Sequence, residues 1–117
     1  MSSVEASLSR LLDLPGVTGV SLIDAVTGLT YGDAGEGGSD PVECSRLATS
    51  VESGLNAAGV QGELESIVIT GGSRQLVVAT VPRQGDPLLL TAALERGQAN
   101  LALVLHHLGL YAAEVTA

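Results

Sequence analysis

Apolar residues recur along this chain with two different periods, and the alternation of the two predicts the order of its elements. A helix comes first, capped by Ser2 or Ser3 and ended before Pro15-Gly16. Its apolar positions, which recur at helical spacing, are Val4, Leu8, Leu11 and Leu12. The run Val17–Asp24 is rich in Val, Leu and Ile and predicts a strand.

A turn at Thr27-Gly28 brings the chain back along that strand, so Leu29–Gly32 is predicted as the second strand of a hairpin. The glycine-rich stretch Gly35–Ser39 then predicts a loop.

The middle helix has the clearest start signal in the chain. Asp40 is a good N-cap, Pro41 suits the first helical position, and Glu43 completes a capping-box-like pattern. Gly59 ends the helix. Between these ends runs an apolar seam at spacings of four and three residues, formed by Cys44, Ala48, Val51, Leu55 and Ala58.

Two interpretations of this seam are open. A heptad seam has a shape that suits a second helix, which favours a contact with another chain. The seam can also face the sheet of its own chain. In the first case Leu47, which lies between the seam positions, is free to face the sheet.

Three further strands are predicted at Leu64–Thr70, Gln75–Val81 and Leu88–Ala92, separated by Gly71-Gly72 and by Gln84-Gly85-Asp86. A final helix is predicted from about Leu94 to Ala113. Its main apolar row is Leu94, Leu101, Leu105, Leu108 and Ala112.

The resulting order, α-β-β-α-β-β-β-α, predicts an α+β domain that spans residues 1–117. Short connections between neighbouring strands predict a mostly antiparallel five-stranded sheet. Strands that are apolar over consecutive residues are usually covered on both faces. We therefore expect helices on both sides of the sheet.

Charge narrows the classes of partner. The net charge is −8, and all five basic residues are scattered arginines. A nucleic-acid binder needs a basic stripe to neutralise phosphates, so nucleic acid and anionic membranes are poor candidates, whereas a basic protein surface is favoured. No segment has the length of apolar sequence that spans a membrane, and the N-terminus lacks a signal pattern. We expect a cytoplasmic protein.

Candidate catalytic and ligand-binding groups are sparse. The lone Cys44 lies on the apolar seam, and the adjacent His106 and His107 point about 100° apart on a helix, so they do not share a metal. Gly35–Gly38 lacks the lysine of a phosphate-binding loop. A triad of Ser21, Asp24 and His106 would need a nucleophile elbow around Ser21, and the sequence has none. We expect Asp24 to start the hairpin turn instead. We predict no catalytic residue, no cofactor and no metal.

Four segments in this order resemble the roadblock/dynein light chain family, and the resemblance covers nearly the whole chain. Leu14–Asp24 resembles the opening "PGV-x-G" strand of that family, and Thr27–Leu29 resembles its first hairpin. Leu64–Ile69 resembles its middle strand, and Glu95–Ala102 resembles the start of its closing helix. The bacterial branch of the family, which is associated with small GTPases, is the one that this chain resembles.

The resemblance implies a homodimer in which the middle helices lie antiparallel and the middle strands pair across the two-fold axis. That arrangement adds Ile67 and Ile69 to the seam as predicted interface residues. Pairing with its own copy would also protect Leu64–Thr70, which has one acid, Glu65, and no proline to prevent aggregation at a sheet edge.

The resemblance further implies that the protein regulates or carries a small Ras-like GTPase, in some members within gene clusters that also encode a sensor-kinase-like protein. Arg46, Glu52 and Asn56 are the predicted docking residues on the outer side of the paired helices. The alternative function is a small-molecule sensor of the profilin-like or PAS-like kind. Such a sensor needs a cavity with aromatic and polar groups, and the chain has only two tyrosines and no Phe or Trp.

Overall fold

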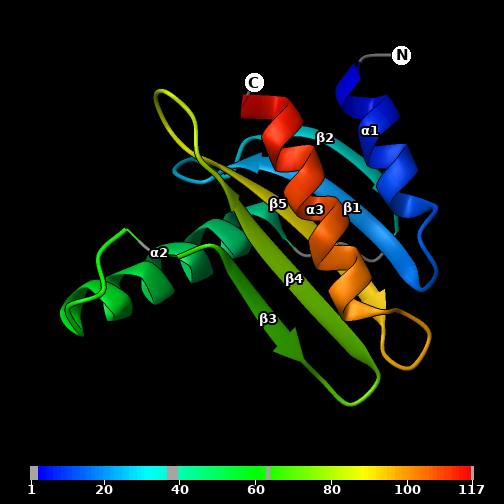
Figure 1. Cartoon of the computed structure of the whole chain (residues 1–117). Helices are drawn as coiled ribbons and strands as arrows, with labels where there is room; N and C mark the ends of the chain where they lie inside the picture. Colours follow the sequence, from blue (N-terminus) through cyan, green and yellow to red (C-terminus); the bar gives the residue numbers. More distant parts are fainter. Residues whose placement is uncertain (1–2, 37–39, 63, 117) are drawn as a thin grey trace.

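Five antiparallel strands form a single sheet with the order β2-β1-β5-β4-β3 (Figure 1). The computed structural model describes residues 3–36, 40–62 and 64–116. Its elements are α1 (Ser3–Leu12), β1 (Val17–Asp24), β2 (Thr30–Gly35), α2 (Pro41–Ala57), β3 (Ser66–Thr70), β4 (Arg74–Val81), β5 (Leu88–Glu95) and α3 (Leu101–Thr116). The predicted fold class is therefore confirmed, and β1 has the predicted bounds.

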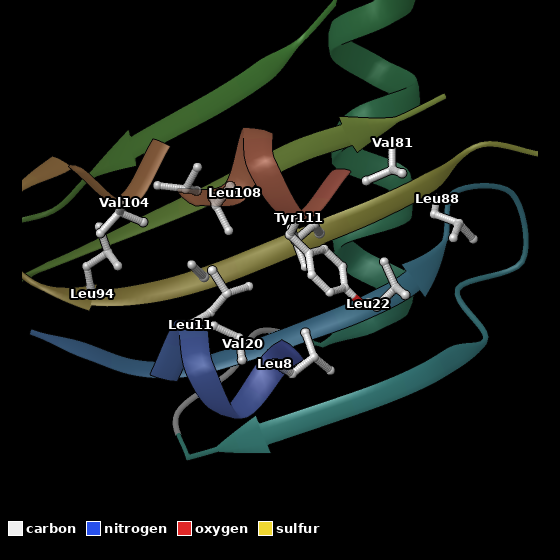
Figure 2. Close-up of a cluster of buried hydrophobic side chains, with 13 residues drawn as sticks. Leu8, Leu11, Val20, Leu22, Val81, Leu88, Leu94, Val104, Leu108 and Tyr111 are labelled. Atoms are coloured by element: carbon white, nitrogen blue, oxygen red, sulfur yellow. The ribbon is translucent and has the colours of Figure 1, made fainter. Parts of the chain in front are cut away.

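Helices cover both faces of the sheet, as the apolar strands predict. On one face α1 and α3 pack over the larger core, which Figure 2 shows between the two helices and the strands. Buried side chains from both helices meet the sheet there, namely Leu8, Leu11, Val104, Leu108 and Tyr111. On the other face α2 covers a smaller core. Because Leu22 and Ile23 are consecutive and both buried, β1 contributes to both cores.

The opening motif needs glycine at Gly16 because of a close approach between distant segments. Gly16 has φ +80°, and a Cβ atom at this position would overlap the backbone of Ala99. The Gly16 carbonyl accepts a hydrogen bond from the Glu95 backbone N–H at 2.7 Å. This glycine therefore allows the start of β1 to lie against the end of β5 and the turn that follows it.

The prediction that the last helix starts near Leu94 is wrong. Leu94 is a buried residue of β5, paired with Val17 of β1 and Gln75 of β4. Strand β5 lies between β1 and β4, so its backbone has ladder partners on both sides up to its end, and these extend the strand beyond the predicted Ala92. The helix starts at Leu101, after Asn100 accepts a hydrogen bond from the Leu103 backbone N–H at 3.1 Å.

Other boundaries differ by a few residues. β2 continues to Gly35, which the sequence places in the loop, and β3 begins at Ser66 rather than Leu64. The turn between β3 and β4 includes Ser73 as well as the two predicted glycines, with the Gly71 N–H donating to the Arg74 carbonyl at 2.8 Å. Ser2, a predicted cap, and residues 37–39 of the predicted loop lie outside the described residues.

Candidate functional site

The start of α2 is held by the cap that the sequence predicts. The Asp40 carboxylate accepts hydrogen bonds from the backbone N–H groups of Val42 at 2.9 Å and Glu43 at 3.2 Å. Pro41 occupies the first helical position, where a missing N–H costs nothing. The cap therefore fixes where α2 begins.

The apolar seam of α2 divides into two parts. Cys44 and Ala48 are buried against the chain's own sheet. Their neighbours in this smaller core are Ile23, Val78 and Leu89. Val51 and Leu55, one and two turns further on, are half-buried, and Ala58 is exposed at the C-cap. The first half of the seam thus completes the intramolecular core, whereas the second half keeps apolar surface open to solvent.

This second half lies where the sheet ends. In Figure 1 the C-terminal half of α2 projects past the outline of the sheet beside β3. Leu47, which the sequence leaves free to face the sheet, is half-buried. The role of the five seam residues in an interface stays a prediction.

Strand β3 lies at an edge of the sheet and pairs with β4 on one side. Ile67 packs against the smaller core, on the same face as α2. Ile69 faces the same way, opposite Leu76 of β4, and is 41% exposed. Ile67 and Ile69 therefore give β3 apolar side chains on the α2 side of the sheet, at the edge where the ladder of backbone hydrogen bonds can accept another strand.

The three predicted docking residues are all exposed on α2. Arg46 lies on the face opposite the seam and pairs with Glu43 at 3.2 Å, an exposed pair between successive turns. Asn56 lies near this outer face and Glu52 on its flank, as their spacing along the helix requires. The geometry therefore makes these side chains available to a partner.

The structure separates the residues considered for catalysis. Ser21 alternates with Val20 and Leu22, so it faces away from α3, and its hydroxyl forms a hydrogen bond with the Thr91 hydroxyl. His106 is exposed on α3, on the other side of the sheet. No group of three or more His, Cys, Asp or Glu side chains able to hold a metal occurs within the described ranges.

Asp24 instead organises the turn between β1 and β2. Its Oδ1 accepts hydrogen bonds from the backbone N–H groups of Thr27 at 3.0 Å and Val26 at 2.8 Å. These bonds, together with the guanidinium of Arg83, hold the pKa of the Asp24 carboxyl below its ordinary value of 3.8, although burial opposes them. Sequence reasoning predicts the turn, but it does not predict the pairing with Arg83, whose Nη2 lies 4.0 Å from Oδ2.

A groove of about 680 Å³ lies on the face of the sheet that α1 and α3 cover, between α3 and the β3–β4 edge. Leu64, Thr80, Pro82, Leu105 and Gly109 are among the residues that line it.

Among the helices of the described residues, none combines the length and the apolar character needed to cross a membrane.

Neither a protein-family model nor a curated protein sequence matches this chain. Solved structures do match it. The Roadblock/LC7 domain from Streptomyces avermitilis has a TM-score of 0.84 at 20% identity, over 97% of this chain and 95% of that one. MglB from Myxococcus xanthus has a TM-score of 0.76 at 18% identity, over 99% and 94%. An MglB structure described as having a tetrameric arrangement has a TM-score of 0.68 at 24% identity, over 96% and 83%. The chain therefore has the fold of the roadblock proteins.

Proposed function

We propose that this chain, as a single roadblock-type domain, is a non-catalytic adaptor that forms a homodimer and docks a small Ras-like GTPase. The observation that carries the proposal is the apolar surface on the α2 side of the sheet, to which the overhanging half of α2 and the edge strand β3 both contribute. Val51, Leu55, Ile67 and Ile69 all contribute to this surface. An apolar surface beside an unpaired strand edge is a liability for a monomer and is removed when a second copy covers both.

In the dimer that we propose, the two β3 strands pair across the two-fold axis and the two α2 helices lie side by side. Val51, Leu55 and Ile69 pack at the centre, and Cys44 and Ala48 support the helix from the intramolecular side. The outer faces of the helices then carry Arg46, Glu52 and Asn56 from both protomers. This double surface is the platform that we assign to the GTPase.

The roadblock fold and the sequence resemblance support a GTPase as the partner, because the bacterial branch that the chain resembles is associated with such proteins. Binding to one nucleotide state better than the other would shift the GTPase toward that state. A sensor-kinase-like protein is a further partner within the same proposal.

Two measurements test the proposal. Light scattering over a concentration series should give a mass of twice the 11.8 kDa chain. Purified Ras-like GTPases of the source organism, loaded with GDP or a non-hydrolysable GTP analogue, should include at least one that binds the dimer. A monomer at every concentration contradicts the dimer, and the absence of binding by every GTPase in either state contradicts the docking function.

The groove beside α3 favours a second candidate function, binding of a small molecule. Its volume lies in the range typical of ligand sites, but its lining offers few converging polar groups. A thermal-shift screen with a metabolite panel distinguishes the two functions, because a ligand that binds the folded state raises the melting temperature.

A further inference from the structure

Exposed apolar side chains gather at one end of the sheet, around the turn between β1 and β2. Four of the eight large apolar side chains that are exposed among the described residues belong to this turn, the start of β2 and the first turn of α2. They are Val26, Leu29, Tyr31 and Val42, and with Arg83 we call them the turn patch. Apolar groups gathered in this way mark interaction surfaces more often than scattered ones do.

The turn is fastened to α2, so the patch has a defined shape. The Ser45 hydroxyl donates a hydrogen bond to the Ala25 carbonyl at 2.6 Å, which ties the turn to the second turn of the helix. Gly28 approaches Val42 so closely that a Cβ atom at Gly28 would lie 3.1 Å from the Val42 Cα. Turn and helix therefore present one continuous surface.

Arg83, from the loop between β4 and β5, completes the patch, because this loop and the β1–β2 turn lie at the same end of the sheet (Figure 1). Its guanidinium lies over the Tyr31 ring, 5.6 Å from the centroid, and donates to the Tyr31 hydroxyl at 3.3 Å. Its Nε donates to the Asp86 carbonyl at 2.7 Å. Tyr and Arg held in this way are typical of the residues that dominate binding energy at protein interfaces, since little conformational freedom is left to lose.

We infer that the turn patch is a second contact surface for the GTPase, next to the platform formed by α2. This inference rests on the proposed function and names the residues that extend its docking site. Val42 and Arg46 are four residues apart on the outer side of α2, so the patch is continuous with the proposed platform. The matching partner surface places apolar side chains against Val26 and Leu29 and a carboxylate beside Arg83.

A carboxylate on the partner is favoured only beside Arg83, because the acidic chain otherwise favours a basic partner surface. The chain has a net charge of −8 and five arginines, of which Arg46 and Arg83 flank this surface. Asp24 lies beneath Arg83 but is itself engaged by the turn backbone. Although Arg83 lies 4.0 Å from the Asp24 Oδ2, its side chain is 35% exposed, so a partner carboxylate can contact its guanidinium, which favours one orientation of docking.

The test uses the full chain and the GTPase that binds the wild-type protein. The double variant Val26→Ser/Leu29→Ser removes exposed apolar surface, at 64% and 61% exposure, and leaves Asp24, Thr27 and Gly28 in place. We expect its dissociation constant for the GTPase to rise at least tenfold, with dimer mass and melting temperature unchanged. The matched control is Leu103→Ser/Leu110→Ser on α3, where the exposures are 38% and 50%. We expect the control to bind within twofold of wild type.

Three contrary results separate failure of the turn patch from failure of the proposed function. If Val26→Ser/Leu29→Ser binds the GTPase with a dissociation constant within twofold of wild type, the turn patch is not a contact surface. The proposed function is unaffected by that result. A change in dimer mass assigns the patch to self-association and also overturns the inference. If no GTPase binds the wild-type chain, both the proposed function and this inference fail. Within the inference, Arg83→Gln should weaken binding and reduce its salt dependence, because it removes the exposed guanidinium that contacts the partner carboxylate.

Discussion

Asp24 shows how one side chain can position a surface. Its carboxylate holds the β1–β2 turn through two backbone N–H groups, and its second oxygen faces Arg83 across the end of the sheet. This acid and the hydrogen bond from the Ser45 hydroxyl to the Ala25 carbonyl together hold the turn that carries Val26 and Leu29. The sequence alone predicts that Asp24 starts the turn. An Asp side chain that accepts hydrogen bonds from the backbone N–H groups two and three residues later is a local motif.

Replacement of Asp24 by Asn should lower the melting temperature, and the effect should depend on pH. The folded protein holds the pKa of Asp24 below its unfolded value, so the ionised carboxylate stabilises the fold above that unfolded value. This stabilisation is lost as the pH falls through the folded pKa. Thermal unfolding of wild type and Asp24→Asn at pH 7 and below pH 4 should therefore give curves that converge in acid. The exposed Asp13, changed to Asn, is the control, and a difference for Asp24→Asn that stays constant with pH would contradict the role.

At the scale of elements, the proposed dimer depends on β3 and α2 together. Strand β3 alone is a short edge with apolar residues on both faces, and α2 alone covers only part of the smaller core. Each leaves apolar side chains partly open to solvent on the same face of the sheet, Val51 and Leu55 on α2 and Ile69 on β3. The two faces of β3 differ in their surroundings: Ile69 faces the α2 side, whereas Val68 faces the α3 side.

This difference gives a matched pair of variants. In the proposed dimer Ile69→Lys places a charge where α2 of the second copy packs, so we expect dissociation, because a buried unpaired charge is costly. Val68→Lys adds the same charge to the same strand at nearly equal exposure, 39% against 41%, but on the open side. We expect it to leave the dimer mass unchanged. Light scattering and circular dichroism of both variants provide the measurement. Dimers of equal stability for both would contradict packing over the α2 side of β3.

At the scale of the whole molecule, charge opposes self-association. Two chains of net charge −8 repel each other, so the proposed dimer must be held by its apolar surface and strand pairing. Salt screens repulsion between exposed charges, with a Debye length of about 10 Å at 0.1 M.

We therefore expect the dimer to tighten as salt is added. Sedimentation in 20 mM and 500 mM NaCl should show a dissociation constant several-fold lower at the higher concentration. The opposite trend would mean that ion pairs, and not apolar contacts, hold the copies together. Glucose at matched osmolality is a suitable control for effects of the solute other than charge.

The sequence by itself determined what depends on near neighbours along the chain. The capping residues Asp40 and Pro41, the strand Val17–Asp24 and the turn at Asp24 are all encoded within a few residues, and the structure confirms them. The order of elements and the alternation of apolar residues were sufficient for the fold class.

Only the tertiary structure decided what depends on distant neighbours. Strand β5 extends to Glu95 because β1 and β4 supply its hydrogen-bond partners, and no local pattern contains that information. The α2 seam divides between core and solvent because the sheet ends beneath it. Arg83 reaches Tyr31, which is 52 positions away in the sequence, because the register of the sheet brings their loops together. Local signals specify elements, whereas packing between elements decides which side chains remain exposed for a partner.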